Sequence, residues 1–138
     1  MLSLEEATRV LTTQGAPYEM EECVVQGQRL RCWKHLPSTL PALVQHSRTY
    51  GDRVYLVYED ERYTYEETFR RVCTLAEQLR TAFGVRKGDR IAIAMRNYPE
   101  WPIAFWAATS AGAIAVPLNA WWTGCLLYTS DAATTPYV

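Results

Sequence analysis

The sequence lacks the features that mark membrane, secreted and nucleic-acid-binding proteins. A membrane-spanning helix needs about 20 apolar residues, and the longest candidate, Ile103–Leu118, contains polar and glycine interruptions. The net charge is only −1, so no excess of positive charge attracts a nucleic acid or an anionic membrane. The first residues, MLSLEEATRV, include two acids where a secretion signal has basic residues before an apolar block. We therefore expect a cytoplasmic protein with no transmembrane segment and no nucleic-acid partner.

Cysteine and histidine are too few and too widely spaced for a metal centre. None of the four cysteines forms a C-x-x-C pair, and the two histidines stand far apart. A structural zinc site needs such ligands at characteristic spacings, so we expect no bound metal. Free, mostly buried thiols are typical of a reducing compartment. We therefore expect free thiols at the four cysteines, Cys23, Cys32, Cys73 and Cys125. We expect no metal-binding role for the two histidines, His35 and His46.

Catalytic side-chain pairings are also missing. There is no G-x-S-x-G motif, and no acid pair whose context separates it from surface charge. The acidic run Glu59–Glu61 is interpreted as a solvated turn. Gly84–Arg90 lacks the patterns of phosphate-binding loops and precedes a strand, whereas such loops lie between a strand and a helix. We interpret it as a helix end and a tight turn with Gly88 at positive φ.

What is present is the composition of an ordinary globular domain. The chain has 138 residues, of which 49% are hydrophobic and 21% charged. A chain of this size buries roughly two thirds of its surface on folding. The first part predicts a helix over residues 3–14, a hairpin of 19–25 with 29–34 turning at 26–28, and a helix from Ser38 or Thr39 through Tyr50 that ends at Gly51.

The second part predicts a further hairpin, Val54–Glu59 with Arg62–Tyr65, that leads into a helix. A capping box of Thr64 with Glu67 begins this helix, and Gly84 ends it. Glu66–Arg70 and Glu67–Arg71 are expected ion pairs on its solvated side. Its apolar face is expected to consist of Phe69, Val72, Cys73, Ala76, Leu79 and Phe83.

A strand, a helix and a second strand follow. Ile91–Met95 and Ala113–Val116 have no polar alternation, which predicts parallel strands buried on both faces. The helix between them begins near Pro99 or Pro102, because only a first turn tolerates proline. The order of elements indicates an α/β fold with parallel strands and a crossover helix, preceded by hairpins.

Two groups of residues are candidates for binding. Arg96 and Asn97 follow a strand of the expected parallel sheet, where α/β proteins place ligands. An Asn at this position more often bonds the turn and the first N–H groups of the next helix, and both interpretations of Asn97 stay open. Among the tryptophans, Trp106 is interpreted as core packing, whereas Trp121 and Trp122 follow a strand end and could reach a pocket.

Two blocks of the sequence resemble those of adenylate-forming (AMP-binding) enzymes, and most closely the acyl-CoA synthetases. RYTYEE at Arg62–Glu67 is similar to the family's early (T/S)-Y-x-E block. GVRKGDRIAIAMRNYPEW and AGAIAVPLN within Gly84–Asn119 are similar to its second block. With the preceding WKHLPSTLPALVQHSRTYGDRVYLVYEDE, the resemblance covers about residues 30 to 124 and keeps the family's order and intervals.

The resemblance implies the N-terminal portion of the large domain of such an enzyme, and a reaction in two steps. A carboxylic acid, with a fatty acid as one candidate, attacks the α-phosphate of ATP to give an acyl-adenylate and pyrophosphate. The thiol of coenzyme A then takes the acyl group. ATP, Mg²⁺ and CoA are therefore the implied cofactors of the parent ligase. The family's functional residues lie downstream of the matched blocks, so we assign this chain no catalytic, cofactor-binding or metal-binding residue and expect it to be inactive.

The C-terminal tail predicts a different origin. Tyr128–Pro136 superficially resembles the family's phosphate loop, but it lacks the loop's glycines and lysine. Cys125–Ser130 can be encoded by TGT CTC TTA TAC ACA TCT, which resembles the transposase end sequence of sequencing libraries. Asp131–Ala133 fits the adapter that follows it. We therefore expect residues 1–124 to be an incomplete N-terminal subdomain and 125–138 to be a non-native tail.

Two alternatives remain open. The chain could be a non-catalytic α/β module that binds or interacts without chemistry. It could also belong to an adenylation domain that loads the thiol of a carrier protein in place of CoA. The first alternative predicts a genuine stop codon after residue 138 and cooperative unfolding of the isolated chain.

Overall fold

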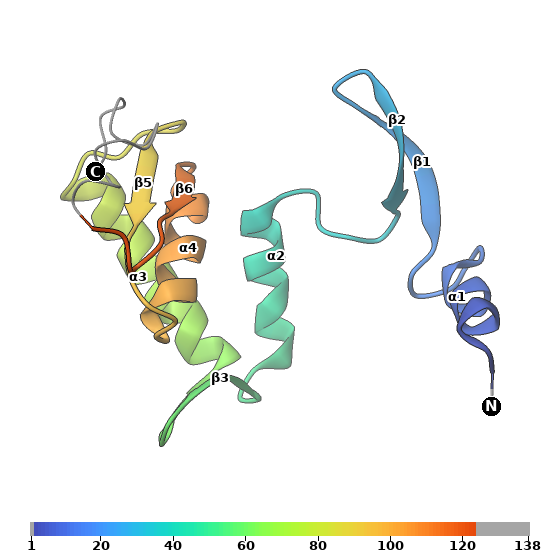
Figure 1. Cartoon of the computed structure of the whole chain (residues 1–138), viewed down its shortest axis with the longest axis horizontal. Helices are drawn as coiled ribbons and strands as arrows, with labels where there is room; N and C mark the ends of the chain where they lie inside the picture. The colour runs from blue at the N-terminus through green and yellow to red at the C-terminus, as the bar shows by residue number, and fades with distance from the viewer. Residues whose placement is uncertain (1, 124–138) are drawn as a thin grey trace. The chain divides into compact units, whose positions relative to one another are not determined.

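The computed structural model describes residues 2–123 (Figure 1). They form two compact units that meet in the sequence between Ser38 and Thr39. The expected tail, 125–138, lies outside the described residues.

The first unit contains a helix and a two-stranded hairpin. α1 (Leu4–Thr12) begins with the expected capping box, in which the Glu6 carboxylate accepts the Ser3 N–H at 2.8 Å. β1 (Met20–Val25) pairs antiparallel with β2 (Gln28–Trp33). Gln26 and Gly27 form the turn, both at positive φ, the combination that two-residue hairpins of type I′ require. None of residues 2–38 is buried, so local bonds hold this unit together.

A disulfide joins the two strands of this hairpin. Cys23 on β1 is bonded to Cys32 on β2, with their Cα atoms 6.1 Å apart. Cys23 lies opposite Leu30, two residues from Cys32, so both cysteines point to the same face of the hairpin. The expectation of free, mostly buried thiols is therefore wrong for these two residues, and Cys73 is exposed. The separation of nine residues between Cys23 and Cys32 matches no metal-binding pattern. The hairpin turn midway between them nevertheless brings the two thiols together.

The second unit starts with two short helical segments and a hairpin. Thr39 caps α2 (Leu40–Ser47), as expected, and the 3₁₀ helix η1 (Arg48–Tyr50) completes the predicted segment up to Gly51. β3 (Val54–Tyr58) then pairs antiparallel with β4 (Glu61–Thr64). This confirms the second hairpin, and its turn residues Glu59 and Asp60 are exposed as predicted.

α3 (Tyr65–Thr81) is the longest helix of the described part of the chain and begins with the predicted Thr64–Glu67 capping box. Val72 is buried, and Phe69, Ala76 and Leu79 pack around it, which confirms most of the apolar face.

Two details of α3 are corrected. Phe83 is 63% exposed because the helix ends at Thr81, before this residue could continue the apolar stripe, and Cys73 is exposed as well. The Glu66–Arg70 ion pair is present at 3.2 Å. The Glu67–Arg71 pair is not, because the Glu67 carboxylate accepts the Thr64 N–H in the capping box.

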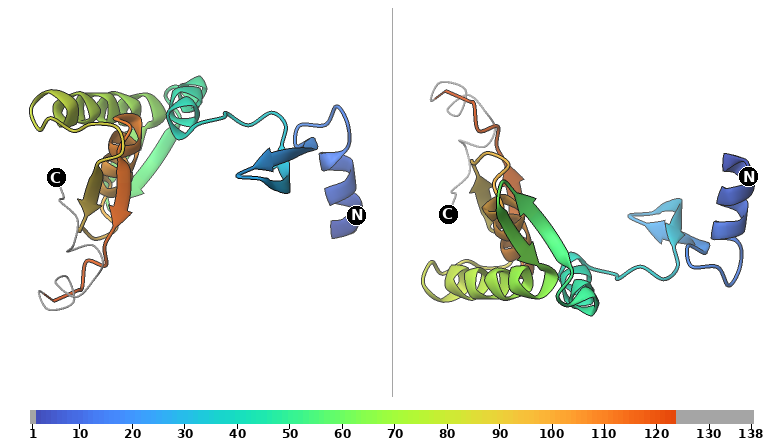
Figure 2. Two further views of the ribbon diagram at one scale, coloured as in Figure 1. Left: turned by 90° about the horizontal axis from the view of Figure 1, so that it is seen from above. Right: turned by 90° about the horizontal axis from the view of Figure 1, so that it is seen from below.

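β5 (Arg90–Ile93), α4 (Glu100–Ser110) and β6 (Ile114–Pro117) form the predicted strand–helix–strand unit. The two strands are parallel, and α4 lies alongside both (Figures 1 and 2). Pro99 is the N-cap of α4 and Pro102 its third residue, so the first turn accommodates both prolines. The α/β fold of parallel strands, a crossover helix and hairpins is confirmed.

The core of the second unit consists of two small clusters. Val44, Val72, Ile103 and Ala107 join α2, α3 and α4, and Val85, Ile91, Ala108 and Ala113 join α4 to the strands. Burial on both faces of the strands is a wrong prediction, since Ile114 is 48% exposed and Ala94 is exposed. The reason is that helices cover only one face of a sheet of two strands in the described region.

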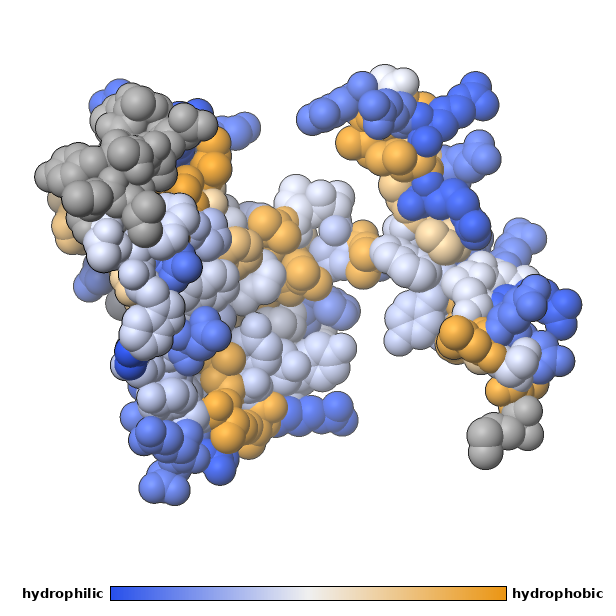
Figure 3. Space-filling model, in the orientation of Figure 1, coloured by the Kyte–Doolittle hydropathy of each residue, from blue (hydrophilic) through white to orange (hydrophobic). Residues whose placement is uncertain are grey.

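Figure 3 shows apolar side chains at the surface. No helix within residues 2–123 has the length and hydropathy to cross a bilayer.

Candidate functional site

The site begins with the alignment of two strands. Backbone bonds link the turn before β5 to the turn before β6: the Gly88 N–H donates to the Gly112 carbonyl at 3.0 Å, and the Ile114 N–H to the Asp89 carbonyl at 2.7 Å. Arg90 therefore pairs with Ile114, and the register continues to the end of both strands. The residues after β5 and β6 consequently emerge at the same edge of the sheet, where α/β folds bind ligands.

An open cleft of about 550 Å³ lies at this edge. Its walls come from the segment after β5, the first turn of α4 and the segment after β6. The described residues that line it are Met95, Arg96, Asn97, Trp101, Pro117, Leu118, Asn119, Ala120 and Trp121.

A side-chain contact across the cleft joins the segments that follow the two strands. The Arg96 guanidinium carbon lies 3.9 Å from the centre of the Trp121 ring, a cation–π contact. Asn119 positions Trp121, because its Oδ1 accepts the Trp121 N–H at 2.9 Å. Trp121 is 72% exposed, so this contact is solvated and its indole remains accessible to a ligand.

The side chains determine which chemistry the cleft can support. One guanidinium and the carboxamides of Asn97 and Asn119 offer hydrogen bonds to an anionic or polar group, and two indoles offer flat apolar surfaces. Among the described residues of the lining there is no carboxylate, imidazole, thiol or lysine. Such a surface can bind and orient a ligand, but it provides neither a nucleophile nor a general base.

ATP and Mg²⁺ do not fit this surface. Mg²⁺ is held in proteins by carboxylates and substrate phosphates, and phosphate groups are cradled by glycine-rich loops that present successive N–H groups. β6 ends at Pro117, which has no N–H, and no acid lines the cleft within the described chain. No step through ATP or magnesium is therefore derived from these residues.

The structure distinguishes among the residues singled out by sequence. Arg96, Asn97 and Trp121 meet in the cleft. Asn97 does not cap α4, because Pro99 is the N-cap and no side-chain hydrogen bond caps this helix. Trp106 packs against the core as predicted.

The Gly84–Arg90 segment is the predicted turn. Gly84 and Gly88 both have positive φ, and the Asp89 carboxylate accepts the Arg86 N–H at 2.8 Å. Because this carboxylate points back to the backbone of its own turn, the segment presents no cradle of free N–H groups for a phosphate.

Sequence reasoning did not single out Asn119, and it considered Trp101 only as one of five tryptophans that could line an acyl tunnel or touch a membrane. Trp101 lies in the first turn of α4 and faces the strand ends, and Asn119 follows β6. The signal was available for Asn119, since a polar residue after the second parallel strand must emerge beside the residues that follow the first. No comparable signal identifies Trp101, whose direction depends on where α4 begins.

Comparison with known proteins identifies the family. The sequence pattern of the family described as "AMP-binding enzyme" matches residues 43–130, well over half of the chain. This chain belongs to the AMP-binding enzyme family. The acetyl-coenzyme A synthetase of Allorhizobium ampelinum is 38% identical over 76 residues, which cover 51% of this chain and 12% of that enzyme.

Solved structures from two proteins share the fold of this chain. The N-terminal subdomain of NpsA from Klebsiella oxytoca matches with a TM-score of 0.61 and 28% identity, over 64% of this chain and 23% of that one. The O-succinylbenzoate coenzyme A synthetase of Bacillus subtilis, solved with AMP, matches with a TM-score of 0.55 and 36% identity, over 58% of this chain and 21% of that one. The chain thus spans about an eighth of the length of the curated relatives it matches.

Proposed function

We propose that this chain of the AMP-binding enzyme family is the N-terminal scaffold of an ATP-dependent acyl-CoA synthetase. The parent enzyme would convert a carboxylic acid, ATP and CoA into acyl-CoA, AMP and pyrophosphate through an acyl-adenylate. The observation that carries the proposal is the 38% identity to an acetyl-coenzyme A synthetase over 76 residues. Acetate is thus the first substrate to test, and a fatty acid the second.

The chain's own contribution is structural in this proposal. Its described cleft offers one cation, two carboxamides and two indoles, which can bind part of a ligand but cannot activate a carboxylate or an ATP. We therefore keep the prediction that no residue of this chain is catalytic and that ATP, Mg²⁺ and CoA act at residues the parent supplies elsewhere.

Transfer to a carrier protein is the second candidate. NpsA has been solved as an artificially fused adenylation–PCP di-domain, and this chain shares its fold with a TM-score of 0.59 in that structure. An adenylation domain of that kind would use the same first step and a carrier-protein thiol in the second. The choice of acceptor separates the two candidates.

The proposed location is the cytoplasm, where ATP and CoA are available. The Cys23–Cys32 disulfide argues against this location, because such bonds persist mainly in oxidising compartments. A thiol count on protein isolated under alkylating conditions tests it, since a cytoplasmic protein would yield all of its cysteines as alkylated thiols.

Sequencing the source DNA without transposon-based libraries, across the codons of Gly124 and Cys125, is the first test. If the frame continues, its product should form acetyl-CoA and AMP from acetate, ATP and CoA, whereas the 138-residue chain should bind no ATP in a calorimetric titration. The family match extends through residue 130, into the segment that we assign to the tail. A genomic frame that encodes Cys125–Val138 followed by a stop codon would overturn the proposal and favour a non-catalytic module.

A further inference from the structure

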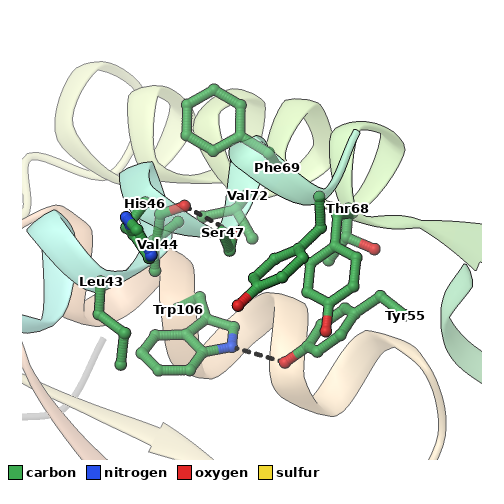
Figure 4. A pocket seen from close by; sticks show the side chains of 11 residues that line it. Leu43, Val44, His46, Ser47, Tyr55, Thr68, Phe69, Val72 and Trp106 are labelled. Carbon is green, nitrogen blue, oxygen red and sulfur yellow. Dashed lines mark hydrogen bonds between the residues drawn. The ribbon is translucent and has the colours of Figure 1, made fainter. Parts of the chain in front are cut away.

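A second cavity lies in the same unit, away from the strand edge. It has a volume of about 250 Å³ and is enclosed by α2, η1, β3, α3 and α4 (Figure 4). It shares no lining residue with the cleft at the carboxyl ends of β5 and β6. Its distinguishing feature is an aromatic wall made of Tyr50, Tyr55, Tyr65, Phe69 and Trp106.

The aromatic wall is ordered by contacts among its rings. The centre of the Tyr65 ring lies 4.9 Å from that of Tyr50 and 4.6 Å from that of Tyr55. These separations are typical of favourable aromatic pairs. Rings held in this way provide flat apolar surfaces with few conformations to lose, which suits a flat apolar ligand.

Hydroxyl groups give the cavity a polar side, and they belong to Ser47, Tyr50, Tyr55, Tyr65 and Thr68. Thr68 is only 4% exposed, and its Oγ1 has no hydrogen-bond partner among the described residues. By contrast, Thr74 and Thr81 on the same helix donate to the carbonyls four residues earlier, at 3.0 and 2.8 Å. A buried hydroxyl without a hydrogen-bond partner is unfavourable. A ligand that supplies a partner to the Thr68 hydroxyl therefore binds more tightly.

Another of these hydroxyls belongs to Tyr55. Its oxygen accepts a hydrogen bond from the Trp106 indole Nε1 at 3.3 Å, the dashed line between the two residues in Figure 4. Because the oxygen acts as an acceptor in this bond, the hydroxyl proton remains available for a second acceptor. Tyr55 therefore offers the cavity a donor, and Thr68 offers a hydroxyl that can donate or accept.

The volume of the cavity and the charge of its lining restrict the class of ligand that it can bind. An apolar cavity of about 150 Å³ holds one benzene molecule, whereas drug-sized ligands use pockets of about 300–1,000 Å³. The present cavity lies between these limits. The described residues that line it include the imidazole of His46 but no Asp, Glu, Lys or Arg, so no carboxylate, ammonium or guanidinium of the lining could pair with an ionic ligand.

We propose that this cavity is a binding site for a small uncharged aromatic molecule with one hydrogen-bonding group, of which phenol is the simplest probe. The ring would lie against the tyrosines, and the hydroxyl would bond with the unpaired Thr68 Oγ1. This site does not depend on the proposed ligase function, because it needs neither ATP nor the strand-edge cleft.

The test is a titration of the ¹⁵N-labelled 138-residue chain with phenol and, separately, with toluene. The Trp106 indole N–H resonance, assigned with Trp106→Phe, reports on the cavity, and that of Trp121 reports on the cleft. We expect phenol to shift the Trp106 signal to saturation and to bind about tenfold more tightly than toluene, the equivalent of one hydrogen bond. The Trp121 signal should not move.

Three variants make the test specific. Thr68→Val removes only the unpaired hydroxyl and should weaken phenol about tenfold without weakening toluene. Thr74→Val on the exposed side of α3 is the matched control and should bind both probes as the parent chain does. Leu43→Trp should block both, because Leu43 lines the cavity and is 37% exposed, which leaves room for a larger side chain at the rim. The proposal is overturned if neither probe saturates the Trp106 signal, or if Thr68→Val leaves the preference for phenol unchanged.

Discussion

Arg48 and Glu66 form a double hydrogen-bonded ion pair between η1 and the first turn of α3. Arg48 Nε lies 3.0 Å from Glu66 Oε2, and Nη2 lies 3.2 Å from Oε1. The side chain of Glu66 is 22% exposed. The Arg48 guanidinium, together with a further bond from Arg70, holds the pKa of Glu66 below its usual range. This ion pair links η1 to α3, two elements that the β3–β4 hairpin separates in the sequence.

The first prediction concerns the pH dependence of this pair. Since the pKa of Glu66 is lowered in the folded chain, the pair stabilises the fold above the unfolded pKa, about 4.3 for glutamate. That contribution should disappear as the pH falls from there through the lowered pKa. A double-mutant cycle with Arg48→Gln and Glu66→Gln, measured by urea unfolding, should show favourable coupling at pH 7 and none at pH 2.

Arg70→Gln is the control for this cycle. Arg70 bonds the same carboxylate at 3.2 Å but is 75% exposed, so its coupling to Glu66 should be weaker and more sensitive to salt. Equal coupling of Arg48 and Arg70 to Glu66 would contradict the special role of the double-bonded pair.

The second prediction concerns the hydrogen bond between Tyr55 and Trp106. Tyr55→Phe removes the acceptor and leaves the half-buried indole N–H without its partner. We expect a loss of about 1 kcal/mol in the free energy of unfolding. Chemical denaturation measures it, with Tyr18→Phe in the first unit as a matched control. An unchanged midpoint for Tyr55→Phe would show that water replaces the tyrosine without penalty.

The third prediction concerns Gly112, between α4 and β6. Its φ is +86°, a conformation that side chains disfavour, whereas an added Cβ would meet Lys87 only at 3.5 Å, an ordinary contact. Backbone strain should therefore dominate, and Gly112→Ala should destabilise the second unit by about 1–2 kcal/mol. Gly112→Asn should destabilise it less, because asparagine tolerates positive φ better. Thermal unfolding that ranks the asparagine variant below alanine would refute the strain argument.

The fourth prediction concerns the disulfide of the first unit. A bond that closes a loop of this length restricts the unfolded chain by about 2.5 kcal/mol, and an isolated two-stranded hairpin is marginal without such help. Cys32→Ser should therefore increase amide hydrogen exchange across residues 20–33. Exchange in α3 should stay as before, because residues 39–123 have their own core. Protection that survives in the variant would assign hairpin stability to the Lys34–Glu19 ion pair instead.

The fifth prediction concerns the edges of the β5–β6 pair. Within the described residues these strands form a sheet of only two, and Ile114 on β6 is 48% exposed. Unpaired edges with apolar side chains favour association between chains. Sedimentation velocity should show self-association that increases with concentration and decreases in Ile114→Lys. Phe83→Lys, which removes an exposed apolar side chain outside the strands, is the control. A sharp, concentration-independent melting transition of a monomer would contradict this prediction.

Local signals predicted most of the fold. The capping boxes at Ser3 and Thr64 fix helix starts through bonds between residues three apart, so they can be read directly from the sequence. The positive φ at Gly88 likewise follows from a local turn. Burial was harder to predict, because the exposure of Ile114 and Phe83 depends on which elements cover them. A pairing such as Cys23 with Cys32 requires the hairpin register, which a search for metal spacings does not consider.

The candidate site was predicted only in outline. Arg96 and Trp121 lie at strand ends, and the parallel pairing of those strands predicts that they share an edge. Their contact over the indole ring depends on Asn119, whose bond to the Trp121 backbone sets the direction of the chain after β6. Such a bond depends on the conformation of the loop, which composition and periodicity do not specify.

The backbone hydrogen bonds between the turn before β5 and the turn before β6 affect how insertions can alter the lining of the cleft. The Gly88–Gly112 and Asp89–Ile114 bonds fix the start of each strand, and the strand lengths then determine which residues emerge together at the far edge. One residue inserted after Gly112 would advance β6 by one position and place Leu118 where Asn119 now stands. Every side chain of that strand would also turn to the opposite face. A change in turn length can therefore replace the chemistry of the cleft without substituting any residue that lines it.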